Sequence, residues 1–415
     1  MIRSVAVVTT VAVLGCAAPV VSPTDKARCA RPDPVAEAKR AVAALRVVSF
    51  KSRPMYDVGA GRKSVTFTPR DAGPDARAVI TFPFPGKFDG APNGFERLKW
   101  RSYTYDNALY ALWHTANGNQ EDAAEILATL AALQRLDGAW GFSFDVRHGS
   151  FYNAGYVRTG AVAWVTYAFA MYAEAFDDDR FAGPTVRGAK WLDRQVDAKT
   201  GLLRGGSGRW IDGGKSFEPG YVADWSSTEH NVDAYFAFKA LRHAGFQTRT
   251  DPAALATLIA ARLYLQDEGR YAQGLQPTGH DRISALDAAG TWTALFDVSR
   301  GANKRAVSAL AWVDRVHGVN DGGWRGYKPY QRGPNVWFVE GSIARALADH
   351  RLGRKQRARA FVSEVAQLAC IAGGPLLYST SWAPDFPATP AAAPTLWFAL
   401  TVREVSAGKQ PFLWR

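Results

Sequence analysis

The feature that most constrains this chain is a repeated pair of helical segments. Six segments are apolar nearly all round and rich in Ala, Trp, Tyr and Phe, and they begin at Tyr105, Thr159, Thr228, Ala285, Trp337 and Ala393. Their starts lie 54, 69, 57, 52 and 56 residues apart. Five of them are followed by an amphipathic segment, over 120–134, 184–195, 252–266, 304–317 and 355–370. A helix that is apolar on every side is buried and one with a polar face lies outside, so the pattern predicts a ring of helical hairpins.

The first 18 residues do not share this pattern and are predicted to be a secretory signal. One Arg precedes the ten-residue apolar run 5–14, which is about half the length needed to cross a bilayer. The tetrapeptide VLGC at 13–16 resembles a bacterial lipobox, in which Cys16 would be lipidated. Simple cleavage after Ala18 is the alternative. We therefore expect an exported protein, periplasmic or attached to the cell envelope, with a linker over 19–32.

The segment 33–46 is predicted to close the ring. Six inner helices with only five following outer helices leave one outer position open, and this capped amphipathic stretch (DPVAEAKRAVAALR) fits it. It would then lie beside the fifth outer helix, which ends at Cys370. Cys29 lies just before the closing helix, and an oxidising compartment allows the two cysteines to pair. We expect a disulfide that joins the two ends of the ring; two unrelated thiols are the alternative.

Residues 47–100 interrupt the helical pattern. Alternation of apolar and polar residues over 63–68 and 76–82 predicts short strands. Pro83, Pro85, Gly86 and Gly90 predict a long loop. No boundary in this stretch indicates a separate domain. We therefore predict a single all-α domain over 33–415, an (α/α)6 toroid of six hairpins with a short extended segment near 47–100.

Acidic residues recur at one end of the inner helices. When the helices are aligned on their starts, four units place an acid in the first turns: Asp106, Glu229, Asp287 and Glu340. Inner helices all run in the same direction, so these carboxylates would gather at one mouth of the ring. Capping and the helix dipole favour any single acid at such a position. Four acids in otherwise apolar, buried helices indicate instead a functional role for these carboxylates. Glycosidic hydrolysis is one such role, because it uses two carboxylates that flank the bond.

The densest polar patch in an inner helix is 225–233, with the sequence WSSTEHNVD. Glu229 is predicted to be the general acid, with a pKa raised by burial and by neighbouring carboxylates. Asp233 lies four residues later and shares its helix face. His230 is expected to form hydrogen bonds more than to catalyse. Glu229 and Asp233 alone are too few ligands to predict a metal site.

The expected spacing of the acids favours an inverting mechanism. Neighbouring inner helices pack about 10 Å apart, so acids from units one, three and five lie farther apart than the roughly 5 Å of a retaining pair. Asp106 or Glu340 would then be the base that activates water. A structure that places a candidate pair near 5 Å would reverse this choice.

Aromatic residues near the mouth are candidates for stacking on sugar rings. The chain contains 14 Trp, 15 Tyr and 22 Phe, more than a core requires. Loops 138–142 and 321–327 lead back from outer helices to the mouth. We expect substrate contacts from His230, Asp233, Asp287, Tyr105, Trp140, Trp225, Trp324, Tyr327 and Trp337. The alternative for each Trp is that it fills a gap between hairpins.

This layout resembles the six-hairpin glycosidase superfamily, the (α/α)6 toroids that include many bacterial polysaccharide hydrolases. The STEHN motif at 227–231, followed by Trp-x-x-Glu-Gly at 337–341, is similar to a group of bacterial exported toroid proteins. Ser342 stands where a Thr is usual and keeps the hydroxyl. The resemblance covers about residues 100–415. It implies a carbohydrate-active enzyme whose cleft lies at the acidic rim.

Three other function classes stay open beside an exported glycoside hydrolase. A polysaccharide lyase acting on an acidic glycan suits the net charge of +12. A non-catalytic glycan-binding toroid would also have a cleft. The segment 133–140 resembles the Gln-Trp repeat of terpene cyclases, but that motif is mainly structural and occurs clearly only once.

The remaining predictions concern partners and cofactors. The basic residues are scattered, without a run of five Lys or Arg, so no nucleic-acid partner is expected. No P-loop, HExxH or complete GxGxxG motif occurs. We therefore expect a monomer that binds a carbohydrate, uses no cofactor or metal, and touches a membrane only through a lipid anchor.

Overall fold

The computed structural model describes residues 27–51, 55–58, 66–69, 75–83, 98–147, 149–153, 155–212 and 216–415. The predicted signal segment with Cys16 lies outside the described residues, as do residues 84–97 of the predicted loop. None of the described helices is long and apolar enough to cross a membrane.

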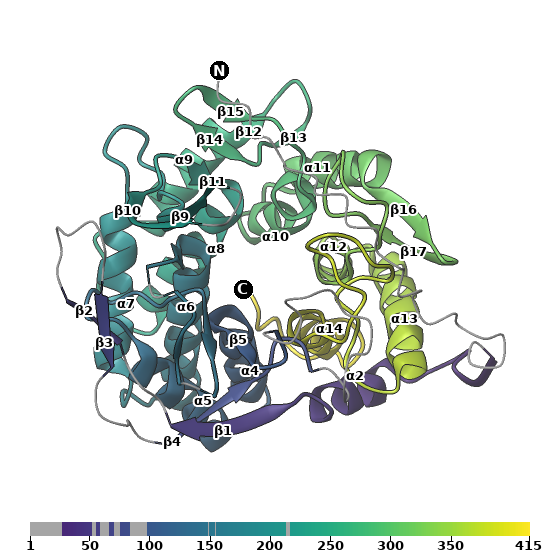
Figure 1. The fold of residues 1–415 in the computed structure, drawn as a ribbon. Helices are drawn as coiled ribbons and strands as arrows, with labels where there is room; N and C mark the ends of the chain where they lie inside the picture. Colours follow the sequence, from purple (N-terminus) through teal and green to yellow (C-terminus); the bar gives the residue numbers. More distant parts are fainter. Residues whose placement is uncertain are drawn as a thin grey trace.

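The helices form two concentric rings, as predicted (Figure 1). The inner helices are α4 (Thr104–Ala116), α6 (Thr159–Phe176), α8 (Thr228–His243), α10 (Trp292–Ser299), α12 (Val339–Arg351) and α14 (Ala392–Val405). The outer helices are α5 (Gln120–Leu133), α7 (Ala182–Gln195), α9 (Pro252–Leu263), α11 (Asn303–Val316), α13 (Lys355–Ala372) and α2 (Pro34–Ala43). Every residue of α6 from 159 to 172 is buried, whereas α7 buries only the face that it turns to the core. The (α/α)6 toroid is confirmed.

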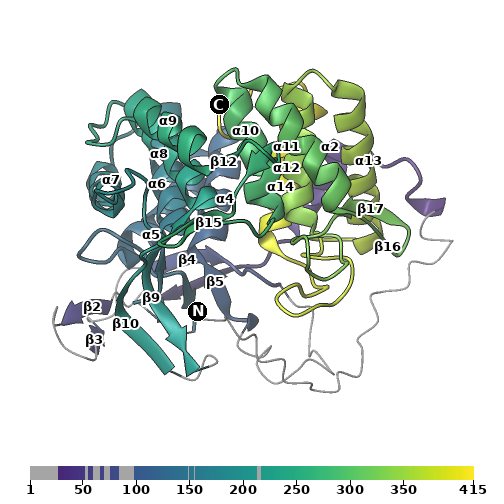
Figure 2. The ribbon, with the colours of Figure 1, turned by 90° about the horizontal axis from the view of Figure 1, so that it is seen from above.

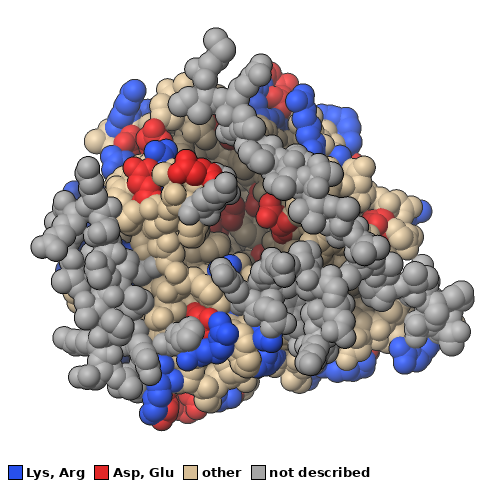
Figure 3. Space-filling model, in the orientation of Figure 1, with Lys and Arg blue, Asp and Glu red and all other residues tan. Residues whose placement is uncertain are grey.

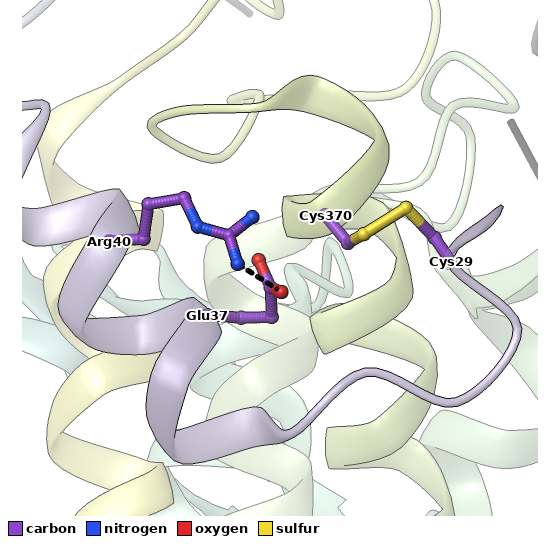
Figure 4. Close-up of a disulfide and its surroundings, with 4 residues drawn as sticks. All are labelled: Cys29, Glu37, Arg40 and Cys370. Atoms are coloured by element: carbon purple, nitrogen blue, oxygen red, sulfur yellow. Dashed lines mark hydrogen bonds and ion pairs between the residues drawn. A yellow bond between two sulfur atoms is a disulfide. The ribbon is translucent and has the colours of Figure 1, made fainter.

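Helix α2 closes the ring as the sixth outer helix. It packs against α14 and α13, which come from the far end of the chain (Figure 1). Asp33 caps it by accepting a 2.9 Å hydrogen bond from the Val35 N–H, and Pro34 occupies its first turn. Cys29 and Cys370 form a disulfide with their Cα atoms 5.8 Å apart (Figure 4). The two ends of the ring are thus joined both by packing and covalently.

The fourth inner helix departs from the expected regular form. It opens with η2, a π-helical turn over Asp287–Thr291, and continues as α10. Gly290 lies where this turn meets α11: a Cβ added there would sit 2.7 Å from the Ala309 carbonyl oxygen. Single π turns widen a helix locally and are frequent at functional sites.

Short antiparallel ribbons occupy the connections between helices. Their strands pair as β1 (Val47–Lys51) with β4 (Asp75–Val79), β2 (Met55–Val58) with β3 (Thr66–Pro69), β5 (Arg101–Tyr103) with β6 (Ser143–Asp145) and β7 (Ser150–Phe151), β8 (Val157–Arg158) with β9 (Gly206–Ile211) and β10 (Ser216–Val222), β11 (Ser226–Ser227) with β14 (Gly274–Gln276) and β15 (Gly279–Asp281), β12 (Tyr264–Leu265) with β13 (Arg270–Tyr271), and β16 (Gly318–Asp321) with β17 (Trp324–Tyr327). Strands β1 to β4 confirm the extended segment predicted near 47–100. Figure 2 shows β9 and β10 projecting beyond the helices, on the side opposite the C-terminus.

The C-terminal residues fill the bore of the ring. Trp414 is fully buried and its ring stacks on Phe236, with centroids 4.7 Å apart and planes 4° from parallel. The Trp414 backbone N–H donates a 2.9 Å hydrogen bond to the Tyr167 hydroxyl, and the Trp414 carbonyl accepts a 2.8 Å hydrogen bond from Arg351. The Trp414 ring also contacts Trp164, Trp292 and Trp397. These aromatic rings therefore form a floor across the centre of the ring.

Candidate active site

A central pocket of about 380 Å³ lies at the N-terminal ends of the inner helices. Each inner helix or its first turn contributes to the wall, through Asp106, Gly160, Glu229, Asp287, Glu340 and Ala393 among others. Figure 3 shows Asp and Glu side chains inside the central hollow, while most of the visible Lys and Arg lie toward the outside. The common direction of the inner helices thus brings the predicted acids together.

The pocket is strongly acidic in a chain with a net charge of +12. Its lining carboxylates are Asp106, Glu229, Asp233, Asp287, Glu340 and Asp385. Arg158 is the one Lys or Arg among the described lining residues. Burial, followed by the charge of Arg158, lowers the pKa of His230 to about 3, so this imidazole is neutral. The pocket therefore holds many more acids than cations.

Glu229 and Asp287 form a pair at the edge of the pocket. Both are partly exposed, and they come from neighbouring inner helices. Burial, the charges of Asp287 and other acids, and hydrogen bonding to Asp287 hold the pKa of Glu229 well above its usual range. Burial also raises the pKa of Asp287, although its 2.6 Å hydrogen bond from the Ala288 N–H favours the ionised form. Glu229 is thus the member that retains the proton.

Asp106 lies on α4, two helices away from Glu229 around the ring. It is 1% exposed, and its Oδ2 atom has no hydrogen-bond partner among the described residues. Burial raises the pKa of Asp106 to about 7, and hydrogen bonding to Thr81 opposes this shift. Asp106 can therefore change its protonation state near neutral pH.

Glu340 on α12 is held by a short chain of hydrogen bonds. The Tyr105 hydroxyl donates a 2.6 Å bond to Glu340 Oε1, and the Trp397 Nε1–H donates a 2.6 Å bond to the Tyr105 oxygen. Burial raises the pKa of Glu340 to about 8, against the lowering effect of the Tyr105 bond. These contacts fix the orientation of Glu340 and occupy one of its oxygens.

Asp233 lies one turn deeper than Glu229 on α8. Its exposed fraction is 2%, and neither carboxylate oxygen has a hydrogen-bond partner among the described residues. Burial and the charges of Asp287 and Glu340 hold the pKa of Asp233 well above its usual range, although hydrogen bonding to the Trp164 indole opposes the shift. Asp233 is thus a buried acid with no cationic partner among the described residues and with a neutral indole beside it.

Gly160 explains why the second unit carries no acid at this level. A Cβ added to Gly160 would lie 2.6 Å from His230 Cδ2 and 2.7 Å from Asp233 Oδ2. The missing side chain therefore leaves room for two groups of the next helix.

His230 is held through its backbone rather than through its ring. Its backbone N–H donates a 3.4 Å hydrogen bond to the Ser227 hydroxyl, and the Nδ1 atom of the His230 ring has no partner among the described residues. Ser227 thus acts as the cap of α8.

The structure places seven of the predicted site residues in the pocket and five outside it. The seven are Tyr105, Asp106, Glu229, His230, Asp233, Asp287 and Glu340. Trp225 lies just behind the wall, with its ring centroid 6.1 Å from that of His230. The other four aromatic residues, Trp140, Trp324, Tyr327 and Trp337, do not line the pocket, which corrects their predicted contact with substrate.

Trp140 and Trp337 are fully buried between helices. The Trp140 Nε1–H donates a 2.6 Å bond to the Leu130 carbonyl, which ties the loop to α5. Trp337 packs against Trp324, with centroids 6.1 Å apart, so both fill the core beside β17. The Tyr327 hydroxyl donates a 2.8 Å bond to Asp314 in a separate groove. For Trp140, Trp324 and Trp337 the structure shows the alternative, a ring that fills a gap between hairpins.

Other aromatic residues line the pocket in their place. They are Phe82, Tyr103, Phe142, Trp164, Trp292, Tyr330, Phe338, Tyr378 and Phe386. Trp164 could have been found from the repeat, because it lies five residues after the start of α6, as Asp233 does in α8. Asp385, Tyr330 and Tyr378 come from loops between helices, where no periodic signal marks them.

The described His, Cys, Asp and Glu side chains include no group of three or more placed to hold a metal ion. The arrangement instead supplies a protonated acid, Glu229, and an acid that titrates near neutral pH, Asp106.

Comparisons with known proteins agree with the fold. No family model and no curated protein sequence matches the chain. Solved structures do: D-mannose isomerase has a TM-score of 0.58 and 11% identity over 80% of this chain and 92% of its own. A glycosidase variant in complex with glucose gives 0.56 and 11%, covering 79% and 91%. Cellobiose 2-epimerase from Bacillus thermoamylovorans gives 0.56 and 9%, covering 79% and 92%. At these identities the likeness establishes the toroid fold.

Proposed function

We propose that this protein is a carbohydrate-processing enzyme and, more narrowly, an inverting glycoside hydrolase of the cell envelope. The observation that carries the proposal is that one sugar-sized pocket holds both Glu229, whose pKa is raised by burial and by acidic neighbours, and Asp106 on a non-adjacent helix. Hydrolysis by inversion needs these two groups on opposite sides of the scissile bond, with room for water beside the base. The glycosidase bound to glucose shares this fold.

The two acids divide the reaction between them. Glu229 donates its proton to the glycosidic oxygen as the bond from the anomeric carbon to that oxygen breaks. Asp106 accepts a proton from a water molecule, whose oxygen forms the new bond to the anomeric carbon from the opposite face. One water is consumed, the configuration inverts, and the two carboxyl groups exchange protonation states before solvent restores them.

Asp287 and Glu340 support these roles. After burial, the charge of Asp287 is the main cause that raises the pKa of Glu229, because two neighbouring carboxylates resist double ionisation. Glu340, fixed by Tyr105, faces the same pocket and is suited to hold sugar hydroxyls. The direct contact of Glu229 with Asp287 makes these two one proton-holding unit rather than a pair that flanks a bond.

A sugar isomerase or epimerase is the second candidate. Solved structures with this fold carry those names, with TM-scores equal to or above that of the glycosidase. Such an enzyme would use Asp106 to remove and return a proton on a carbon next to a carbonyl. It would convert a free sugar without releasing new reducing ends, and it would exchange that carbon-bound hydrogen with solvent.

The test is product analysis on a panel of neutral and acidic bacterial glycans. We expect new reducing ends without the ultraviolet absorbance of unsaturated uronates, and a rate reduced by at least ~10²-fold in Glu229→Gln. The matched control is Glu121→Gln on α5, whose side chain is 78% exposed far from the pocket. Absorbing products would establish a lyase, isotope exchange into free sugars an isomerase, and binding without turnover a glycan-binding toroid; each would overturn the hydrolase.

A further inference from the structure

We infer that the pocket binds a sugar with a free, protonated amino group, and that the Asp233 carboxylate is the partner of this ammonium. The inference rests on the proposed function only in taking the pocket as the substrate site. It adds a chemical class of substrate that hydrolysis itself does not require.

The first argument is that Asp233 has no other task. Glu229 is engaged with Asp287, and Glu340 accepts the hydroxyl of Tyr105. Asp106 has the position of the catalytic base. Asp233, by contrast, is 98% buried and lines the pocket without a hydrogen bond of normal geometry to the described residues. The Trp164 indole interacts with it, but this donor is neutral and leaves the charge of the carboxylate unpaired. Leaving a buried polar group without a full partner costs free energy, so a ligand that supplies the partner binds more tightly.

The second argument is that none of the described Lys and Arg side chains pairs with Asp233. Arg158 is the one Lys or Arg among the described lining residues, and its Nη1 donates to the backbone carbonyls of Val157, Ser207 and Gly208 at 3.0–3.1 Å. Its guanidinium also stacks on Tyr156, 3.8 Å from the ring centroid. Arg158 is therefore anchored to β8 and β9 rather than to the acid on α8.

Apart from Arg158, the described pocket groups that surround Asp233 are acidic, neutral or aromatic. Its own helix contributes Glu229 and neutral His230, and the surrounding helices contribute Gly160 and Trp164 (α6), Tyr105 (α4), Asp287 (η2), Trp292 (α10) and Glu340 (α12). Trp164 and Trp292 line the pocket with ring centroids 6.3 Å apart. An ammonium between a carboxylate and indole faces gains both charge pairing and cation–π attraction.

The positive net charge of the chain does not oppose such a ligand. Charges on the outer surface are screened beyond about 8 Å at physiological ionic strength. The buried acids act on a ligand in contact with them, where screening is weak. A glycan that combines acidic groups with a free amine would be attracted to the exterior and still present a cation to the pocket.

Free monosaccharides test the inference without requiring hydrolysis. Calorimetric titration compares glucosamine, galactosamine and mannosamine with their N-acetyl and hydroxyl counterparts, at about pH 6 where the amine is charged. We expect at least one amino sugar to bind tenfold more tightly than both counterparts. Binding should also release protons, detected by repeating the titration in buffers of different ionisation enthalpy, because the ammonium favours ionised Asp233.

Asp233→Asn identifies the residue responsible. The substitution keeps the shape of the side chain and should remove the preference for the amine, whereas Glu121→Gln should retain it. Equal or weaker binding of every amino sugar, or an amine preference that survives Asp233→Asn in a folded protein, would overturn the inference. Amine preference without glycan hydrolysis would remove the hydrolase alone, and hydrolysis of neutral glycans without that preference would remove the amino-sugar site alone.

Discussion

At the scale of single residues, the pKa values of two acids predict the pH dependence of the reaction. Asp106 must be ionised to act as base, and burial places its pKa at about 7. Glu229 must be protonated to act as acid, and burial with its acidic neighbours holds its pKa well above the usual range. The rate constant kcat/KM should therefore fall tenfold per pH unit below about 7. It should decline again only at a higher pH, where Glu229 loses its proton.

A series of initial rates between acidic and alkaline pH checks this prediction, with circular dichroism at each pH to show that the fold persists. The assignment is tested further by Asp287→Asn, which removes the largest charge beside Glu229 and should move the alkaline limb to lower pH. An optimum near pH 4–5, the range of unperturbed carboxyl groups, would contradict the proposed roles of both acids.

Residue by residue, the sequence was informative where a position repeats and uninformative where it does not. Asp106, Glu229, Asp287 and Glu340 were predicted to converge because each starts an inner helix, and the helix direction fixes where it lies. Asp385 was not predicted, because it lies in a loop outside the helical repeat; its own backbone φ is 65°, and its side chain lines the pocket. No local pattern distinguishes such a loop residue from a solvated one.

The prediction that loop Trp residues contact the substrate was wrong for a related reason. A Gly-Trp loop that returns to the mouth can turn its indole to the pocket or into the hairpin junction. Trp140 takes the second course because the Leu130 carbonyl, at the end of α5, needs a donor. That choice depends on tertiary neighbours that the local sequence does not name.

At the scale of elements, the β9–β10 hairpin extends the candidate site beyond the pocket. Arg158, which lines the pocket, stacks on Tyr156; Tyr156 contacts Phe217 with centroids 6.2 Å apart, and Phe217 contacts Trp210 at 4.9 Å. Trp210 is 51% exposed. A continuous row of rings thus leads from the pocket to an indole on the projecting hairpin of Figure 2.

We expect Trp210 to stack on a sugar unit several positions away from the cleaved bond. Trp210→Ala should lower kcat/KM about tenfold on long oligosaccharides and leave the shortest cleaved substrate unaffected. Leu136→Ala, at another exposed apolar residue (67% exposed), is the matched control and should change neither. An equal loss on short and long substrates would instead place the effect of Trp210 on the pocket itself.

The positions of the helices were predictable from the sequence, whereas the π-helical start of the fourth inner helix was not. Period and amphipathicity located all six hairpins because burial imposes a repeating apolar pattern on inner helices. The π turn at 287–291 adds a small local widening that leaves this pattern intact, so only the structure shows it. The same holds for β9 and β10, which lie in a connection with no helical period.

At the scale of the whole molecule, the ring is closed in two different ways. Trp414, near the C-terminus, fills the bore beneath the pocket. The ends of the ring are closed by α2 against α14 and by the Cys29–Cys370 disulfide (Figure 4). The first closure shapes the site, whereas the second holds the barrel around it.

The disulfide should matter for stability and not for the chemistry. It spans 341 residues of sequence, and cross-links over long loops stabilise by about 2–5 kcal/mol, mainly by restricting the unfolded chain. Neither cysteine lines the pocket. Replacing both with Ser should therefore lower the thermal midpoint by roughly 5 °C or more while kcat at 25 °C stays within about twofold.

Reduction of the unmodified protein provides the matched comparison, since it breaks the same bond without changing the sequence. Reduced protein and the double Ser variant should melt together, and the reductant should not affect the variant further. If both kept the original midpoint, packing of α2 against α13 and α14 would suffice to close the ring. If activity fell while the fold persisted, opening the disulfide would have displaced the acids at the rim, and the geometry of the pocket would depend on the covalent closure of the ring.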